Sequence, residues 1–221
     1  MGGEKHMSEI KATPNLGEHM TIQRIKPEDL EEVAALSKKC FGPDMSLTRD
    51  NFENQLKIFP EGQVCLRYKD KIVGSASSLV INFDDYGENH SYTEISDDGY
   101  IRNHNPNGVN LYGIEVGVHP DFRKMKIGKH LYFARREICK ELNLKSIIIG
   151  GRIPNYYKYA NQFTPDEYAN EVIQEKIYDP VLTFQHKNGF QLRKVMQNYL
   201  MDDDASLTNA TLMEWHNPDF A

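Results

Sequence analysis

Residues 116–131, which read VGVHPDFRKMKIGKHL, constrain the fold of this chain more than any other stretch. The pattern predicts a strand that stops at Pro120, a basic loop, and then a helix. Such a loop directs unpaired backbone N–H groups and the positive end of the helix dipole at one point in space. We therefore expect an anion there, with a phosphate or pyrophosphate as the first candidate. The alternative is a structural strand–turn–helix whose basic loop is merely solvated. Four basic side chains surround the point: Arg123, Lys124, Lys126 and Lys129.

The residues on either side of the loop support both elements. The preceding stretch, residues 109–118, is apolar enough to lie inside a sheet. Gly113 and Gly117 interrupt it, and glycine in a strand often marks a bulge or the close approach of another backbone or ligand. Apolar residues at spacings of four and three place a stripe on one face of the helix: Ile127, Leu131, Ala134, Ile138 and Leu142.

The same stretch resembles the coenzyme A signature of the GNAT N-acetyltransferase superfamily, V-x-P-x-[FY]-[RQ]-x-x-G-[IVL]-G-x-x-L. Seven residues fall on this pattern: Val118, Pro120, Phe122, Arg123, Ile127, Gly128 and Leu131. Lys126 stands where the family usually has its first glycine, which lets the loop backbone approach a pyrophosphate closely. The resemblance implies acetyl-CoA as co-substrate and no metal. It places the cofactor against Val116, Val118, Arg123, Lys124, Lys126, Ile127, Gly128 and Lys129.

The resemblance covers roughly residues 20–215 and implies an α/β (α+β) fold. We expect a mixed, mostly antiparallel central sheet with helices on both sides. Two central parallel strands should splay apart, and the pantetheine arm should lie between them. The remaining elements follow the family's order: a strand at 20–25, helices at 27–40 and 46–59, a hairpin of 64–67 and 72–81, a strand at 145–149, a helix at 179–189 and two final strands.

We expect one GNAT-like domain over residues 19–221, after a tag or flexible N-terminus at residues 1–18. Two insertions interrupt the domain, at about 83–107 and 152–178. The first holds six carboxylates and is either a solvated surface excursion or a lid that attracts a cationic amine. The second is rich in tyrosine and either packs as a small helical cap or shapes the acceptor site.

Three shorter runs resemble one bacterial subgroup, in which a GNAT domain precedes a carbon–nitrogen hydrolase of the nitrilase superfamily. These runs are residues 151–156, 177–185 and 210–218. A chain of 221 residues has no room for the hydrolase domain. The resemblance therefore implies a stand-alone relative or the N-terminal domain of a longer protein.

Composition argues against some classes of binding partner. The net charge of −6 argues against a nucleic-acid surface, since it leaves no domain-wide basic face. No apolar run approaches the roughly 18 residues of a membrane span. Three cysteines without CxxC spacing are typical of free thiols in a reducing compartment, so we expect a cytoplasmic protein. The expected acceptor is a small-molecule or peptide amine, and a homodimer is compatible with the sequence.

The chemistry that the resemblance implies is direct acetyl transfer, in which the attacking amine must lose a proton. Glu115 is the sole carboxylate on the central strand, beside the expected thioester, and is our first candidate for the base. Tyr112 is the competing candidate, because by ungapped count it occupies a position where some family members carry their base. A backbone N–H of the splayed strand could polarise the thioester carbonyl.

The acid that protonates the leaving thiolate is less evident. Gln185 stands where the family's last helix commonly has tyrosine, in the pattern Y-x-x-x-G-F. Tyr156, Tyr157, His186 or water are the alternatives. Since Lys126 and Gln185 both depart from the family pattern, a second function stays open, that of a catalytically silent acyl-CoA-binding module for regulation or docking.

Overall fold

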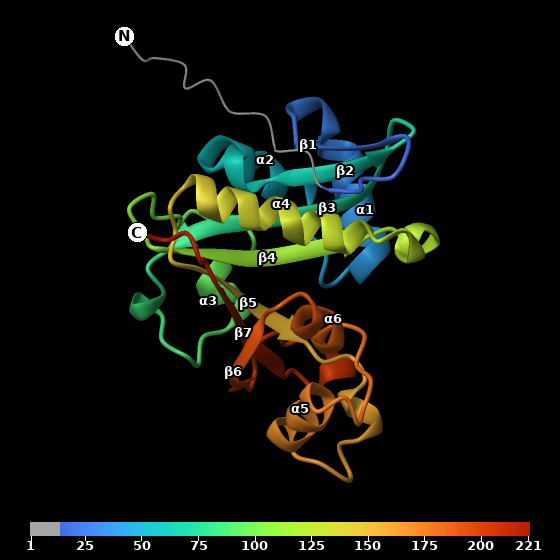
Figure 1. Ribbon diagram of the computed structural model, residues 1–221, viewed down its shortest axis with the longest axis vertical. Coiled ribbons are helices and arrows are strands. Elements are labelled where there is room, and N and C mark those ends of the chain that lie inside the picture. Colours follow the sequence, from blue (N-terminus) through green and yellow to red (C-terminus); the bar gives the residue numbers. More distant parts are fainter. Residues whose placement is uncertain (1–13) are drawn as a thin grey trace.

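The computed structural model describes residues 14–221. Of the tag or flexible N-terminus expected at residues 1–18, residues 1–13 lie outside this range. One sheet of seven strands runs through the described part in the order β1-β2-β3-β4-β5-β7-β6 (Figure 1). All neighbouring strands are antiparallel except β4 and β5. The strands are β1 (Met20–Arg24), β2 (Val64–Tyr68), β3 (Lys71–Ile81), β4 (Asn110–Val118), β5 (Ser146–Arg152), β6 (Gln191–Met196) and β7 (Ala210–His216).

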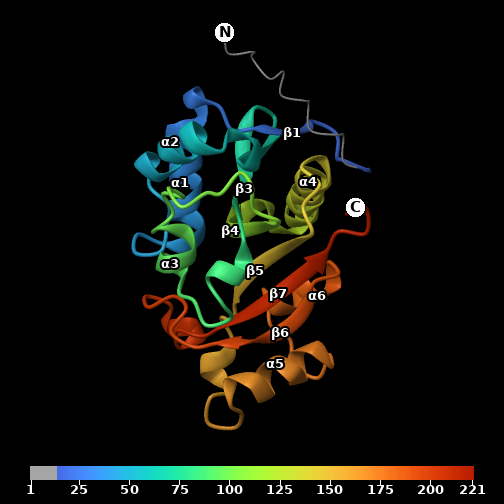
Figure 2. The ribbon, with the colours of Figure 1, turned by 90° about the vertical axis from the view of Figure 1, so that its left-hand side faces the viewer.

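Helices cover both faces of the sheet (Figure 2). On one face lie α1 (Leu30–Phe41) and α2 (Arg49–Ile58), and on the other lies α4 (Ile127–Glu141). This arrangement confirms the mixed, mostly antiparallel sheet between helical layers that the sequence predicted. The helices α5 (Pro165–Ile173) and α6 (Leu182–Lys187) lie beside the β5–β7–β6 end of the sheet (Figure 1).

Several predicted helices are shorter than expected, for local reasons. The segment from Pro27 begins as a 3-10 turn, and the α-helix starts only at Leu30. α2 starts after Thr48, whose hydroxyl oxygen accepts the N–H of Asn51 as an N-cap. Before α6, the carboxylate of Asp179 accepts the N–H groups of Val181 and Leu182, so the first turn lies later than the pattern indicated.

The central parallel strands pair only at one end. β4 and β5 are in register from Asn110–Ser146 to Gly113–Ile149, and their pairing stops there. β4 continues to Val118 beside β3, while β5 continues to Arg152 beside β7. The two strands therefore diverge, which is the splay that the sequence led us to expect.

A bulge in β4 coincides with this divergence. Ser77 of β3 pairs with Glu115 and Ser78 pairs with Gly113, so Ile114 is the extra residue. The guanidinium of Arg135 lies beneath the bulge with 2% of the residue exposed, and it donates to the carbonyl oxygens of Ser77 and Glu115 at 2.9 and 2.7 Å. Because these hydrogen bonds replace partners that the irregular ladder lacks, Arg135 stabilises the bulge.

The first insertion folds against the domain. It contains a short helix, α3 (Tyr92–Ser96), and buries Ile95 and Ile101 completely. The side chains of Asn51 and Gln55 in α2 donate to backbone carbonyls of residues 98 and 99. This insertion is thus anchored through its backbone and apolar side chains, while its acidic residues are mostly exposed.

Within residues 14–221, none of the helices combines the length and the apolar character needed to cross a bilayer.

Candidate active site

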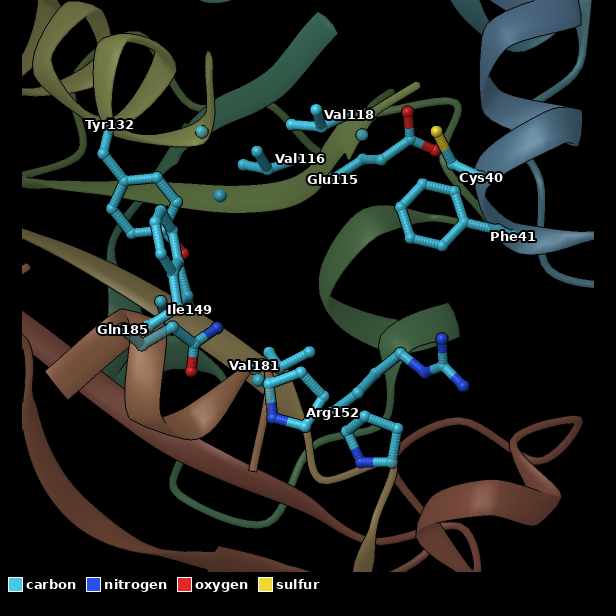
Figure 3. A pocket seen from close by; sticks show the side chains of 18 of the residues that line it. Cys40, Phe41, Glu115, Val116, Val118, Tyr132, Ile149, Arg152, Val181 and Gln185 are labelled. Carbon is cyan, nitrogen blue, oxygen red and sulfur yellow. The ribbon is translucent and has the colours of Figure 1, made fainter. Parts of the chain in front are cut away.

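A cavity of about 660 Å³ lies where β4 and β5 diverge (Figure 3). Its walls come from β4, β5, the N-terminal turns of α4, α6 and the end of α1. In Figure 3, Glu115 and Cys40 stand on one side of the cavity, and Tyr132 and Gln185 stand on the other. The splay therefore opens a space beside the basic loop at the β4–α4 junction.

The loop between β4 and α4 consists of a 3-10 helix and one left-handed residue. Residues 120–125 form a 3-10 helix, and Lys126 then takes a left-handed conformation with φ of 61° before α4 begins. A left-handed residue is easiest for glycine, which explains why the family pattern has glycine here. Lysine adopts the conformation at a cost of about 1–2 kcal/mol, so the loop keeps its course despite the substitution.

Six of the eight residues predicted to hold the cofactor line the cavity: Val116, Val118, Arg123, Lys126, Gly128 and Lys129. The other two do not. Ile127 is fully buried and packs its side chain towards Gly74, so its contribution could come only from the backbone N–H. Lys124 is exposed outside the cavity wall. All eight residues remain predictions as cofactor contacts.

Glu115 is the carboxylate of the cavity wall, with 8% of the residue exposed. The hydroxyl of Ser37 in α1 donates to its Oε2 at 2.7 Å, and the N–H of Leu47 donates to the Ser37 oxygen at 2.9 Å. Oε1 has no hydrogen-bond partner among the described residues. Burial raises the pKa of Glu115 from 4.5 to about 7, against the opposing effect of the Ser37 hydrogen bond. Near neutral pH this carboxyl can both take up and release a proton.

Cys40 adjoins Glu115 in the cavity (Figure 3). Burial, aided by the negative charge of Glu115, raises the pKa of the Cys40 thiol to about 11. Cys65 and Cys139 are buried and their pKa values are raised to about 12, again by burial. At neutral pH all three sulfurs are therefore neutral thiols, which are poor nucleophiles.

Tyr112, the competing base candidate, is fully buried and is not part of the cavity wall. Its hydroxyl lies 2.9 Å from His90 Nε2 and 3.0 Å from the hydroxyl of Tyr199, which does line the cavity. Burial raises the pKa of Tyr112 well above 10, so its phenolate form is scarce at neutral pH. Geometry and charge both favour Glu115 over Tyr112 as the group that meets the substrate.

The candidates for the acid are also separated by the structure. Tyr156 donates its hydroxyl to the carbonyl of Phe163 at 3.1 Å, and neither Tyr156, Tyr157 nor His186 lines the cavity. Gln185 does line it, with Oε1 buried and unpartnered among the described residues. The absence of a side chain at Gly151 makes room for this amide, since a Cβ there would lie 2.1 Å from Oε1. Gln185 can thus accept a hydrogen bond from a ligand N–H.

Three residues of the site escaped the sequence reasoning. Arg135 could have been predicted, because it lies four residues after Leu131 and therefore on the apolar face of α4. A charged side chain on that face must be buried with hydrogen-bond partners. No sequence pattern predicts Ser37 of α1 or Tyr199 in the loop after β6, because they reach the site through long-range contacts.

The comparison of sequences decides the family. The model of the acetyltransferase (GNAT) family matches residues 30–158, more than half of the chain. The chain belongs to the acetyltransferase (GNAT) family. It is 35% identical over 204 residues to the uncharacterized N-acetyltransferase YkwB of Bacillus subtilis, covering 90% of each chain. Family membership and this relative make the chain an acyltransferase of the GNAT type.

A second relative is longer. The chain is 51% identical over 214 residues to the probable hydrolase YhcX of Bacillus subtilis. The match covers 97% of this chain but only 42% of YhcX. The name and length of YhcX are consistent with the subgroup in which a GNAT domain is joined to a hydrolase domain.

Solved structures share the GNAT fold. The loading GNATL domain of CurA from Lyngbya majuscula superposes with a TM-score of 0.81 at 21% identity, covering 90% of this chain and 98% of that one. The GphF GNAT-like decarboxylase, solved with isobutyryl-CoA, has a TM-score of 0.73 at 19% identity and covers 89% of this chain and 99% of its own. At these identities the likeness establishes the fold and nothing finer.

The charged side chains of the cavity wall are basic except for Glu115. Within residues 14–221, no group of three or more His, Cys, Asp or Glu side chains is arranged to hold a metal ion. The basic loop and the start of α4 border the cavity, which is where a helix N-terminus can bind an anion.

Proposed function

We propose that this GNAT-family chain transfers the acetyl group of acetyl-CoA directly to the amine of a small molecule or peptide. The observation that carries the proposal is a single cavity whose wall holds both the basic residues of the loop and the carboxyl of Glu115, whose Oε1 has no partner among the described residues. The thioester supplies the acyl group. The residues of the chain bind and orient the two substrates and transfer protons.

The binding role falls to the loop and to the splayed strands. The N–H groups of Ile127 and Gly128 precede the first hydrogen bond of α4, which Lys129 donates to the carbonyl of Lys126, and they can face an anion together with the positive end of the helix dipole. Arg123, Lys126 and Lys129 add charge along the cavity wall. The Oε1 atom of Gln185 is positioned to accept an amide N–H of the arm. Backbone N–H groups of β4 beyond Gly113 are released from β5 and can polarise a carbonyl.

Glu115 is the proposed base. An amine arrives at neutral pH mainly as ammonium, and Oε1 of Glu115 can take the proton that must leave before nitrogen attacks. The Ser37 hydroxyl donates to Oε2 in the charged form and so holds the carboxylate in one orientation. Because Cys40 is held as a neutral thiol, direct transfer is favoured over an acyl-cysteine intermediate.

Two measurements on the wild-type chain test the proposal. Calorimetry with acetyl-CoA measures binding, and a thiol-release assay over spermidine, lysine, glucosamine and a peptide with a free N-terminus measures turnover. Binding with amine-dependent thiol release supports the proposal. Binding without turnover would favour the silent acyl-CoA-binding module, and no binding would overturn both. Carbon dioxide release from malonyl-CoA is a useful parallel measurement, because GphF is described as a decarboxylase.

A further inference from the structure

Three buried titratable side chains form an unbroken hydrogen-bonded chain that leads away from the cavity. Tyr199 lines the cavity, and its hydroxyl lies 3.0 Å from that of Tyr112. The Tyr112 hydroxyl lies 2.9 Å from Nε2 of His90, and Nδ1 of His90 lies 2.9 Å from the carbonyl oxygen of Gly87. His90, Tyr112 and Tyr199 are 3%, 0% and 3% exposed, so water has little access to these bonds.

The chemistry of the end groups fixes the direction of every bond. A carbonyl oxygen can only accept, so Nδ1 of His90 carries the hydrogen that faces Gly87. In neutral His90, Nε2 is then an acceptor and takes the hydrogen of Tyr112. A phenol has one hydrogen, so the oxygen of Tyr112 must accept from Tyr199. Tyr199 therefore presents only lone pairs to the cavity.

Protonation of His90 reverses the chain. Imidazolium donates from both nitrogens, so Nε2–H now points at the Tyr112 oxygen. Tyr112 then donates to Tyr199, and the hydrogen of Tyr199 becomes free to point into the cavity. The charge state of one buried imidazole thus determines whether the cavity wall offers an acceptor or a donor at Tyr199.

We propose that Tyr199, Tyr112 and His90 form a proton relay, which rests on the proposed acyl transfer and supplies its missing acid. As the N–C bond forms, Tyr199 accepts the second nitrogen proton and passes its own to Tyr112, and Tyr112 passes its own to Nε2 of His90. As the C–S bond breaks and its electron pair goes to sulfur, His90 returns its hydrogen to Tyr112 and Tyr112 returns one to Tyr199. Tyr199 donates the hydrogen that came from nitrogen to the thiolate. The relay ends as it began, and one proton has moved from nitrogen to sulfur. Glu115 removes only the first proton, that of the ammonium.

The surroundings hold Tyr199 in place for this role. A Cβ at Gly150 would lie 2.2 Å from the ring carbon Cζ of Tyr199, so only glycine admits the phenol beside β5. The N–H of Tyr92 donates to the backbone oxygen of Tyr199 at 2.7 Å. The rings of Tyr199 and Tyr92 pack edge-to-face, with centroids 6.2 Å apart.

The groups that face His90 come from several segments. Tyr112 of β4 contributes its hydroxyl, and the rings of Tyr199 and Phe83 lie with their centroids 5.9 and 5.5 Å from that of the imidazole. Glu94 of α3 contributes a negative charge. Burial lowers the pKa of His90 below its ordinary 6.5, and the Gly87 hydrogen bond and the charge of Glu94 oppose this effect. His90 is therefore mainly neutral near pH 7, the state in which Tyr199 can accept.

A spectroscopic experiment tests the relay without any substrate. In protein labelled with ¹⁵N-histidine, with His90→Gln to assign the signal, His90 should be the Nδ1–H tautomer. Tyr112→Phe removes the acceptor that imidazolium uses and should lower the pKa of His90 measurably. Tyr157→Phe, at an exposed site, is the matched control and should leave it unchanged. An Nε2–H tautomer of His90, or a His90 pKa that is the same in Tyr112→Phe as in the wild type, would overturn the relay whatever the protein catalyses.

A kinetic experiment tests its use in catalysis. With an amine that the wild type acetylates, Tyr199→Phe should lower kcat by about 10²-fold or more and leave acetyl-CoA affinity unchanged. Two groups, Glu115 and His90, must be deprotonated, so log kcat should rise with a slope approaching two at low pH. His90→Gln and Tyr112→Phe should reduce this slope to one, whereas Tyr157→Phe should keep it. Unchanged slopes in both variants would refute the relay, while a wild type that acetylates no amine would refute the proposed function instead.

Discussion

Replacing Glu115 by Gln removes one buried charge and keeps the shape of the side chain and its acceptor for Ser37. Burial raises the pKa of Glu115 from 4.5 to about 7. Between these values the folded state holds a proton that the unfolded state has lost, so the free energy of unfolding of the wild type falls as pH rises. At 1.36 kcal/mol for each pKa unit, the gap corresponds to about 3 kcal/mol.

We therefore expect the stability of Glu115→Gln relative to the wild type to increase by about 3 kcal/mol between about pH 4.5 and about pH 8. Urea denaturation at a series of pH values measures this difference in the free energy of unfolding. Glu28→Gln removes an exposed carboxylate and is the control, for which the difference should change far less. A difference for Glu115→Gln that stays constant with pH would refute the assignment of a perturbed carboxyl, and with it the physical basis of the base.

The same variant has a kinetic consequence. Glu115→Gln should leave acetyl-CoA affinity nearly intact and lower turnover about 10²–10⁴-fold, the usual contribution of a positioned acid–base group. The rise in rate with pH that Glu115 causes should also disappear. Normal turnover in Glu115→Gln would mean that Glu115 is not the base, since the relay makes Tyr112→Phe slow in either case.

The remaining predictions concern the loop and the bulge. Gly128→Glu should abolish acetyl-CoA binding in calorimetry through clash and charge repulsion, and unchanged affinity in the folded variant would contradict the site. Arg123→Ala should weaken binding by about 1–3 kcal/mol, and more than Lys124→Ala, whose side chain lies outside the cavity wall. Lys126→Gly should keep the acetyl-CoA affinity and, in urea denaturation, relieve about 1–2 kcal/mol of backbone strain. A large loss of affinity at every salt concentration would mean that the inferred conformation of the loop is wrong. Arg135→Leu should destabilise the fold by about 1–3 kcal/mol for each carbonyl left unpaired, and a neutral effect would show that the bulge needs no such support.

The local parts of this site were predictable because their causes are local. The run from Val116 to Leu131 contains its own strand, stop, basic loop and helix stripe, and the structure has each of them in place. The left-handed backbone at Lys126 follows from the position that glycine holds in the family pattern.

The proton chemistry was only partly predictable. Glu115 could be named from its strand, but its raised pKa and its hydrogen bond depend on Ser37, 78 residues earlier in the chain. The sequence of the first insertion is marked mainly by its carboxylates. Its apolar residues Ile95 and Ile101, both fully buried, are what fold this segment against the domain, and His90 of the same segment is buried as well. Periodicity carries no information on such contacts, because they join segments distant in the sequence.

The most direct test of the central claim follows the acetyl group itself. Trideuteroacetyl-CoA is incubated with the amine panel, and mass spectrometry measures the amide products of the wild type and of Gly128→Glu. We expect a trideuterated amide of at least one amine with the wild type and none above background with the variant. An acetyl-CoA complex of the wild type that yields no labelled amide, or equal product from both proteins, would contradict acyl transfer at the cavity between β4 and β5.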